Sequence, residues 1–305
     1  MSRLPDLFPG FASERIDVGG LILNVRIGGE GEPLLLLHGY PQTHVCWHRI
    51  APALAARFRL VIPDLRGYGE SDVPPDEVEH AAFSKRAMAG DAVALMTRAG
   101  FARFHVAAHD RGARAAYRLA LERPERVASL AVLDIIPTLE VWEGMRAESA
   151  LAAYHWLFLA QPVPMPERLI AADAAAYVEH TLASWTAARS LAAFDPRALA
   201  HYRVALADPA RVHAVCEDYR AGATIDRRHD AEDRAAGRRI TCPTLALWGR
   251  NYMGRGGRGP LDIWRDWAPA VEGRELASGH FLAEEAPDAT VSALLDFLAR
   301  APHIG

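Results

Sequence analysis

Lysine is almost absent from the sequence. Of its 34 basic residues only Lys85 is a lysine, and the other 33 are arginines. Catalysis through a covalent imine needs a lysine amine as the nucleophile. Because only Lys85 could supply that amine, the composition argues strongly against imine chemistry.

Cysteine is also scarce, and its placement excludes two classes of site. The three cysteines, Cys46, Cys216 and Cys242, are far apart and form no Cys-x-x-Cys pair. Neither a disulfide framework nor a zinc ribbon is therefore expected. His44 and His48 are spaced to share a helix face, but no His-Glu-x-x-His motif accompanies them. We therefore predict no metal site.

Long apolar runs are missing as well. No stretch approaches the roughly 18 residues of a membrane span, and residues 1–7 lack an apolar signal core. The formal net charge is −4, whereas nucleic-acid binders usually carry a basic excess. The Gly-Arg run at 254–259 is predicted to be a loop, since one short run is weak evidence for RNA binding. We expect a soluble, cytoplasmic protein with no membrane and no nucleic-acid partner.

What the chain does contain is an alternation of strand-like and helix-like segments. Its composition is 50% hydrophobic and 24% charged over 305 residues, which is ordinary for a globular protein. Short apolar runs predict strands at residues 21–27, 33–37, 58–62, 104–108, 127–133 and 244–248. Helices are predicted at residues 83–100, at 113–122 and after Pro287. Strands separated by helices indicate an α/β fold, with a mostly parallel sheet flanked by helices.

The alternation breaks after Pro137. The pattern there becomes helical and shows no convincing strand until residue 244. We therefore predict one α/β domain with an inserted helical cap. The core would comprise residues 1–138 and 227–305, and the cap residues 139–226.

Asp110 is the candidate nucleophile. It lies between a strand and a helix, in Ala108-His109-Asp110-Arg111-Gly112. An aspartate at such a point can be a simple helix N-cap. The spacing also fits a nucleophile elbow, in which small residues stand two before and two after a nucleophile exposed by a tight turn.

Two further residues support the elbow. Asp134 directly follows the next strand, and His280 lies far downstream, before the last helix. Nucleophile, acid and histidine therefore occur in the order that such sites use. Asp134 alone could be a turn or cap residue, but another common position for the acid, residues 245–253, holds no carboxylate. Asp134 is therefore the best candidate.

A carboxylate nucleophile selects the reaction. An aspartate side chain ordinarily has a pKa of about 3.9, so Asp110 is expected to be an anion at pH 7 and able to displace a leaving group from sp³ carbon. The product is an ester on Asp110, which His280 would hydrolyse by activating water while Asp134 orients the imidazole. Backbone N–H groups of Tyr40 and Arg111 are the candidate donors to an oxyanion.

Arg111 and Arg114 follow the nucleophile at once and share one face of the predicted helix. Cations at this helix end oppose the helix dipole, so helix stability does not require them. They predict a fork that binds a substrate carboxylate bidentately. Surface salt bridges are the alternative interpretation.

Two polar aromatic clusters in the predicted cap, at residues 154–156 and 217–220, could supply donors to a leaving group. The N–H and O–H groups of His, Trp and Tyr suit a small halide. Core packing is the more common role of aromatic side chains in a helical cap.

The sequence resembles the fluoroacetate (haloacetate) dehalogenases of the α/β-hydrolase superfamily over nearly its whole length. The motifs that carry the resemblance are His38-Gly-Tyr-Pro-Gln-Thr43, Asp64-Leu-Arg-Gly-Tyr-Gly-Glu-Ser-Asp72, His109-Asp-Arg-Gly-Ala-Arg114, Leu133-Asp-Ile-Ile-Pro-Thr138, Tyr154-His-Trp156, Cys216-Glu-Asp-Tyr-Arg-Ala-Gly222 and Ser278-Gly-His-Phe-Leu282. The first two are shared with epoxide hydrolases and haloalkane dehalogenases. The arginine pair and the cap motifs are more specific.

The resemblance implies the roles given above for the triad and the arginine pair. It adds a halide site made of His155, Trp156 and Tyr219, and it implies a homodimer that needs no cofactor. Two residues depart from the family pattern: Ala108 stands where the elbow usually has glycine, and Tyr40 stands where phenylalanine is expected.

The leading hypothesis is hydrolysis of a small 2-halo carboxylate, a haloacetate such as fluoroacetate or chloroacetate, to glycolate and halide. An epoxide hydrolase would use the same triad, with Tyr154 and Tyr219 available to protonate the epoxide oxygen. The arginine fork argues against that neutral substrate. A non-catalytic small-molecule receptor is less favoured, because a receptor has no need of a complete triad.

Overall fold

A twisted sheet forms the centre of the molecule, for which a computed structural model describes residues 4–253 and 258–304. Within these residues the sheet has eight strands in the order β1-β2-β4-β3-β5-β6-β7-β8. They are β1 (Ala12–Asp17), β2 (Ile22–Gly28), β3 (Glu32–Leu37), β4 (Phe58–Pro63), β5 (Phe104–His109), β6 (Val127–Leu133), β7 (Thr244–Gly249) and β8 (Val271–Leu276). β2 runs antiparallel to both of its neighbours, and the strands from β4 to β8 are parallel. The predicted α/β class with a mostly parallel sheet is confirmed.

Helices connect these strands and fill the middle of the chain. The α-helices are α1 (Ala51–Ala55), α2 (Lys85–Arg98), α3 (Asp110–Glu122), α4 (Thr138–Glu143), α5 (Ala147–Ala152), α6 (Tyr154–Leu159), α7 (Met165–Ala172), α8 (Ala174–Trp185), α9 (Pro196–Ala207), α10 (Pro209–Ala223), α11 (Ile225–Ala235), α12 (Pro260–Trp267), α13 (Leu282–Glu285) and α14 (Pro287–Leu298). Short 3₁₀ segments are η1 (His44–Trp47), η2 (Val78–Phe83) and η3 (Leu191–Ala193).

The predicted strands all form, because each apolar run is buried in the sheet, but some boundaries differ. Helix α2 begins at Lys85 rather than at residue 83, since the Ser84 hydroxyl caps it by accepting a hydrogen bond from the N–H of Ala87 at 3.2 Å. Helix α3 begins at Asp110 rather than at residue 113, because the elbow residue itself enters the first turn. The two edge strands, β1 and β8, were not predicted; their residues are mostly exposed and carry no apolar run.

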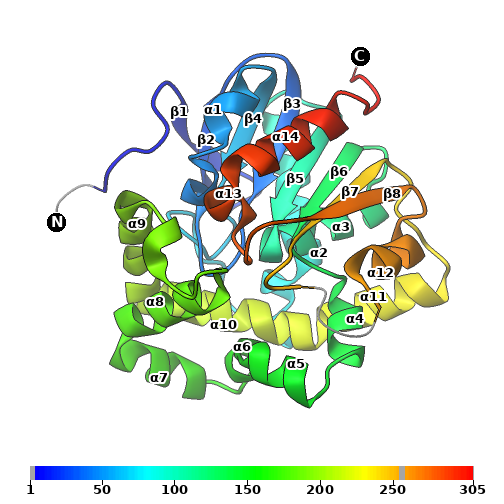
Figure 1. The fold of residues 1–305 in the computed structure, drawn as a ribbon. Helices are drawn as coiled ribbons and strands as arrows, with labels where there is room; N and C mark the ends of the chain where they lie inside the picture. The colour runs from blue at the N-terminus through cyan, green and yellow to red at the C-terminus, as the bar shows by residue number, and fades with distance from the viewer. Residues whose placement is uncertain (1–3, 254–257, 305) are drawn as a thin grey trace.

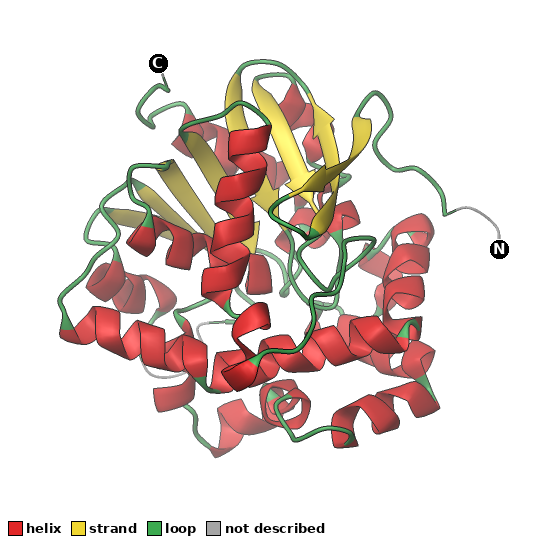
Figure 2. Cartoon of the chain, turned by 180° about the vertical axis from the view of Figure 1, so that it is seen from behind, coloured by secondary structure: helices red, strands yellow, loops and turns green. Residues whose placement is uncertain are grey.

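Helices cover both faces of the sheet. Figure 1 shows α1 and α14 in front of the strands, with α2 and α3 behind them, and Figure 2 shows the helices on that second face from behind. Helix α3 packs against α2 and against β5 and β6. Nearly all its residues are buried, so the residue at its start is held rigidly.

The helices from α4 to α11 form a layer below the strands in Figure 1, at the end of the sheet where β5 and β6 finish. In the described residues between β6 and β7 no strand interrupts them. This helical segment includes the predicted cap at 139–226 and continues through α11, which contacts α4 and α10. The division into core and cap stays a prediction.

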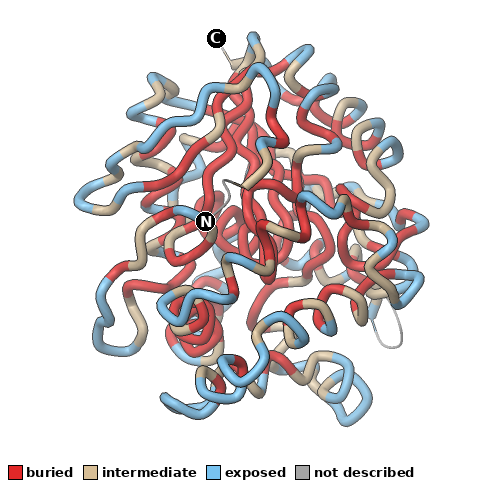
Figure 3. The backbone as a smooth tube through the Cα atoms, turned by 90° about the vertical axis from the view of Figure 1, so that its left-hand side faces the viewer, coloured by how far each residue is buried: buried red, intermediate tan, exposed pale blue. Residues whose placement is uncertain are grey.

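The buried core runs through the sheet and into the junction with the helical layer, and exposed residues lie mainly on the outer turns (Figure 3). No helix of the described residues has the length and apolar character that crossing a bilayer requires. The predicted loop at 254–259 falls mostly on residues 254–257, which lie outside the described part of the chain.

Candidate active site

Asp110 stands at the sharp turn between β5 and α3, with a backbone φ of 45°. The turn requires glycine at two neighbouring positions. A Cβ on Gly112 would lie 2.2 Å from the carbonyl oxygen of His38, and a Cβ on Gly39 would lie 2.3 Å from the Cβ of Asp110. The elbow therefore packs directly against the loop after β3.

Ala108, which stands where the resemblance predicts glycine, fits this turn without strain. It lies inside β5, paired with Leu37 of β3 and Val132 of β6, and is fully buried. An extended strand position accepts alanine, since only a left-handed conformation favours glycine. The strain of the elbow is carried by Asp110 instead.

The three residues of the predicted triad lie together. The Nδ1 atom of His280 is 2.5 Å from Oδ2 of Asp134, and its Nε2 atom is 3.8 Å from Oδ2 of Asp110. Asp134 is held in turn by the backbone N–H of Gly249, which donates to its Oδ1 at 2.8 Å. The imidazole thus lies between an orienting carboxylate and the elbow carboxylate.

Burial sets the charge states of this group. It lowers the pKa of His280 to about 4, although the negative charge of Asp110 opposes the shift. Burial raises the pKa of Asp110. The imidazole and guanidinium groups around it together lower that pKa by more than burial raises it, so the net shift is downward. At neutral pH the site therefore holds a carboxylate anion beside a neutral imidazole, the pair that a nucleophile and a general base require.

A backbone donor fixes the orientation of the elbow carboxylate. The N–H of Tyr40 donates to Oδ1 of Asp110 at 2.9 Å. The other predicted donor, the N–H of Arg111, belongs to the next residue, in the first turn of α3. With Oδ1 bound in this way, Oδ2 is the oxygen that faces His280.

Arg111 is buried and largely committed to a protein partner. Its Nε donates to Oδ2 of Asp218 at 3.0 Å, and its Nη2 donates to Oδ1 at 2.6 Å and to the Asp218 carbonyl oxygen at 2.7 Å. The guanidinium also lies over the ring of Tyr219, with Cζ 4.2 Å from the centroid. Its Nη1 atom is buried and has no hydrogen-bond partner.

Arg114 is anchored at its opposite edge. Its Nη1 donates to the carbonyl oxygen of Ile136 at 3.0 Å and to the Thr138 hydroxyl at 3.1 Å. The guanidinium lies over the Trp156 ring, 4.5 Å from its centroid. Its buried Nε has no partner. Each arginine of the predicted fork therefore keeps at least one unpaired donor.

The predicted halide residues belong to the helical layer, on two helices near Asp110. His155 and Trp156 belong to α6 and Tyr219 to α10, and all three are buried. The Tyr219 ring centroid is 5.7 Å from that of His155 and 5.9 Å from that of Trp156. Tyr40 closes the group from the core side, 5.4 Å from Tyr219, and its hydroxyl donates to that of Tyr177 at 3.1 Å.

Five of the thirteen buried side-chain atoms that have no hydrogen-bond partner in the described residues lie in this region. Buried polar groups are nearly always hydrogen-bonded in native proteins, so such a group of atoms indicates a binding site for a polar ligand. The unpartnered atoms contributed by the predicted site are Arg111 Nη1, Arg114 Nε, His155 Nδ1, Tyr219 Oη and His280 Nε2. The arginine side chain can only donate hydrogen bonds, and the tyrosine hydroxyl is a good donor. These atoms therefore favour an anionic ligand beside Asp110.

Comparison with known proteins places this chain in a family. The family model for the alpha/beta hydrolase fold matches residues 32–287. A fluoroacetate dehalogenase from Burkholderia sp. is 43% identical over 298 residues, covering 97% of this chain and 96% of that protein. The chain belongs to the haloacetate dehalogenase family of α/β hydrolases.

Other members of this superfamily show how widely the fold is shared. A soluble epoxide hydrolase from Corynebacterium sp. strain C12 is 31% identical over 288 residues, and the match covers 92% of this chain and 95% of that protein. A solved structure described as a candidate epoxide hydrolase from Pseudomonas aeruginosa has a TM-score of 0.91 at 46% identity, with 98% of both chains covered. A candidate α/β hydrolase from Nostoc sp. PCC 7120 has a TM-score of 0.91 at 46% identity, covering 95% of this chain and 98% of its own.

The structure adds aromatic residues to the candidate site of this haloacetate dehalogenase family member that sequence reasoning missed. Trp185 lies 4.3 Å from the His155 ring and 5.3 Å from that of His280, centroid to centroid. Its backbone carbonyl accepts the N–H of His280 at 2.9 Å. Tyr252 also contacts the His280 ring, at 4.5 Å. Neither carries a local motif, since each reaches the site only through the packing of its element.

Two charged residues were also missed as members of the site. Asp218 was visible only as part of a polar cluster, and Lys85 only as the single lysine. Both are buried against Arg111: Lys85 Nζ and Arg111 Nη2 contact the same oxygen of Asp218. Lys85 and Arg111 lie 133 and 107 residues from Asp218 in the sequence, so no local pattern could pair them with it.

No group of three or more His, Cys, Asp or Glu residues in the described ranges is arranged to hold a metal ion. His44 and His48, the pair considered from sequence, bind separate partners. His44 Nδ1 lies 2.9 Å from Oδ1 of Asp64, and His48 Nδ1 lies 2.8 Å from the carbonyl oxygen of Val45.

Proposed function

We propose that this haloacetate dehalogenase family member hydrolyses 2-haloacetates to glycolate and halide. As a member of that family the protein is a hydrolase of carbon–halide bonds. The observation that carries the substrate class is the set of unpartnered buried donors around the Asp110 carboxylate. A substrate with one carboxylate and one leaving halide would give those donors two anionic partners.

The first chemical step is displacement at the α-carbon. Oδ2 of Asp110 attacks, the new C–O bond forms, and the C–halogen bond breaks with its electron pair leaving on the halide. Carboxylate contacts from Arg111 Nη1 and Arg114 Nε would fix the α-carbon in line with Oδ2, which lowers the entropic part of the barrier. His155, Trp156 and Tyr219 would donate to the departing halide.

The second step returns the enzyme to its starting state. His280 Nε2 takes a proton from water, and the hydroxide attacks the ester carbonyl carbon of Asp110. The negative charge then develops on Oδ1, to which the Tyr40 N–H already donates. Collapse of the intermediate expels glycolate, whose alkoxide oxygen takes the proton from His280, while Asp134 stabilises the transient imidazolium. Asp110 is left with the second proton of the water molecule and releases it to solvent, which restores the carboxylate anion.

A halide-release panel tests the proposal. Purified protein is given fluoro-, chloro- and bromoacetate, and halide and glycolate are measured together, with Asp110→Asn as the inactive control. Equal amounts of halide and glycolate are expected from at least one substrate. If none of the three substrates yields halide or glycolate, haloacetate hydrolysis is refuted.

Epoxide hydrolysis is the second candidate. The unpartnered Tyr219 hydroxyl supports it, and epoxide hydrolases are among the relatives. The arginine edges beside Asp110 argue for an anionic substrate instead. Turnover of styrene oxide by the same preparation, faster than that of any haloacetate, would favour this alternative.

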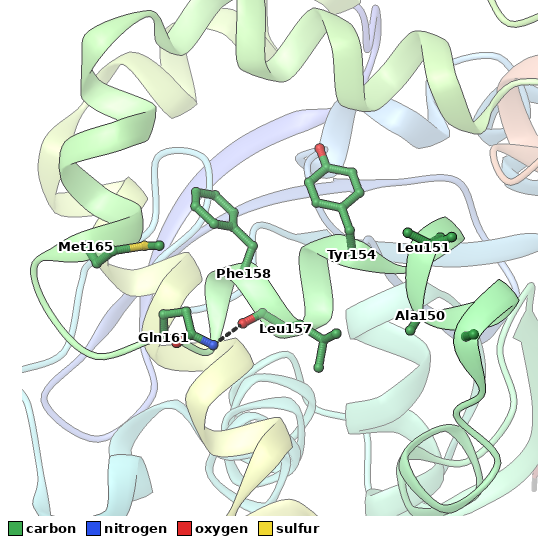
Figure 4. Close-up of a pocket in the computed structure, with 8 residues that line it drawn as sticks. Ala150, Leu151, Tyr154, Leu157, Phe158, Gln161 and Met165 are labelled. Atoms are coloured by element: carbon green, nitrogen blue, oxygen red, sulfur yellow. Dashed lines mark hydrogen bonds between the residues drawn. The ribbon is translucent and has the colours of Figure 1, made fainter.

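We also propose that the protein is a homodimer in the cytoplasm. An apolar groove of about 590 Å³ is lined by residues of α5, α6 and α7 (Figure 4). Leu151 at its rim is 79% exposed, and Met165 is 47% exposed, so a second copy would remove apolar surface from water. Three free, buried cysteines suit a reducing compartment. Sedimentation of the wild type against Leu151→Glu tests the dimer: the wild type should sediment as a dimer and the variant as a monomer.

A further inference from the structure

The single lysine of the chain lies in an energetically unfavourable place. Lys85 is 2% exposed and is the first residue of α2, where a cation opposes the helix dipole. Burying an ammonium group costs several kcal/mol unless a partner compensates it. Its partner is Asp218, which is fully buried on α10.

Asp218 does not need Lys85 to satisfy its hydrogen bonds. Arg111 already donates to both of its carboxylate oxygens, and the Tyr68 hydroxyl donates to Oδ2 at 2.7 Å. Burial raises the pKa of Asp218. Arg111 and Lys85 together lower that pKa by more than burial raises it, so the group is a carboxylate anion. One carboxylate is therefore shared between two cations.

The sharing matters for the charge that faces the substrate. Arg111 and Asp218 alone would form a neutral pair, and Asp218 would remove one of the two positive charges that the predicted fork offers. Lys85 restores that charge. Arg111, Lys85 and Asp218 together carry a net charge of one positive unit, and the unpartnered Nη1 edge of Arg111 belongs to this group, close to the Asp110 anion that repels an incoming carboxylate. Asp226 is a further buried carboxylate beside Lys85, and its Oδ1 accepts the backbone N–H of Lys85 at 2.9 Å.

We propose that Lys85 is a positioning residue for carboxylate recognition: it takes up part of the Asp218 charge and so leaves Arg111 able to bind the substrate carboxylate. The inference rests on the proposed function, because it assumes that the Arg111 edge receives a carboxylate. Asp218 holds the guanidinium in place, and Lys85 prevents that anchor from neutralising it.

Binding of glycolate, measured by calorimetry, tests the inference without turnover. Lys85→Met removes the charge and keeps an unbranched apolar side chain beside Met88. The variant should bind glycolate at least about tenfold more weakly, the effect expected for one unit charge several ångströms away at an effective dielectric near 20. The KM for chloroacetate should rise more than kcat falls. Lys85→Gln carries the same expectation if Lys85→Met does not fold.

A double variant separates charge from packing. Lys85→Met combined with Asp218→Asn removes one charge of each sign, so Arg111 is no longer neutralised. It should bind glycolate more tightly than Lys85→Met alone. A loss of packing at residue 85 would not be reversed by a second change that also weakens the anchor of Arg111.

Asp233→Asn serves as the matched control. Asp233 is buried and pairs with Arg118 on the same helix as Arg111, but it does not contact the predicted site. This variant should lose stability while keeping the glycolate affinity of the wild type. The inference is overturned if folded Lys85→Met binds glycolate as the wild type does, if the double variant binds more weakly than Lys85→Met, or if Asp233→Asn weakens binding equally.

The same experiments keep the two proposals apart. Wild-type protein that binds glycolate but releases no halide would refute haloacetate hydrolysis, while the Lys85 comparison would still stand or fall on binding. Wild-type protein that releases chloride, with unchanged binding in Lys85→Met, would refute only the role of Lys85.

Discussion

At the scale of single residues, the chemistry depends on one carboxylate being an anion and one imidazole being neutral. Asp110 and His280 are 3.8 Å apart, and both are buried. Charged neighbours favour the anion, whereas burial disfavours the imidazolium. The two groups thus obtain complementary roles from the same enclosed environment.

Replacing the histidine should separate the two chemical steps. In His280→Asn the displacement by Asp110 can proceed, because the nucleophile needs no base. Hydrolysis of the ester should slow by about 10³-fold, a typical contribution of a general base. Intact-mass measurement after addition of chloroacetate should show an ester of glycolate on Asp110. Absence of any adduct, with halide release also lost, would contradict this mechanism.

The pH dependence follows from the direction of the His280 shift. Its folded pKa is about 4, so the imidazole is neutral and able to accept a proton at pH values well above 4. Hydrolysis of the ester should be independent of pH between about 6 and 8 and should fall as the pH drops through about 4. Single-turnover rates across buffers measure it. A rate that halves near pH 6.5, the ordinary histidine value, would show that burial does not control this group.

At the scale of secondary-structure elements, the approach of α3 to the β3 loop positions the nucleophile. Gly112 lies where a Cβ would be 2.2 Å from a backbone oxygen, whereas Gly90 in α2 has nothing within 4 Å of that position. Backbone cannot move aside as a flexible side chain can. The first glycine is therefore required by packing, and the second is not.

This contrast gives a matched pair of variants. Gly112→Ala should reduce the free energy of unfolding by about 1–3 kcal/mol, the usual cost of overpacking, and should displace Asp110 and slow turnover. Gly90→Ala should stabilise the protein by about 0.5–1 kcal/mol, because alanine is the better helix former. Urea denaturation and halide release measure both. Equal effects of the two substitutions would show that the elbow is not tightly packed.

At the scale of the whole molecule, buried charges join segments that are far apart in sequence. Arg118 on α3 pairs with Asp230 on α11 at 2.5 Å and also with Asp233. Asp230 further accepts the Tyr117 hydroxyl at 2.7 Å and the N–H of Leu139 at 3.1 Å. These contacts fix the end of the helical layer against the sheet that carries Asp110.

Removing this junction should cost much of the stability of the fold. Asp230→Ala leaves the buried Arg118 with one carboxylate fewer and frees two other donors. We expect a loss of about 3–5 kcal/mol in the free energy of unfolding, the range for breaking a buried ion pair. Asp296→Ala, at an exposed position of α14, should change it by less than about 0.5 kcal/mol. Denaturant titration of both variants checks this; similar losses would mean that the buried junction contributes little.

The sequence by itself determined the alternation of strands and helices, the elbow at Asp110 and the candidates for the triad. These follow from local patterns, because apolar runs, small residues around a turn and the order of three motifs can be read without knowing the fold. The edge strands β1 and β8 could not be found in this way, since their mostly exposed residues are ordered by pairing with β2 and β7.

Only the tertiary structure decided how the charges around Asp110 are shared. Sequence showed two arginines on one helix face, but not that Asp218 holds Arg111 or that Lys85 contacts the same carboxylate. The aromatic contacts of Trp185 with His280 likewise depend on packing between distant elements. The physical reason is the range of the interactions. Helix and strand preferences act over a few residues, whereas desolvation and ion pairing act between whatever the completed fold brings together.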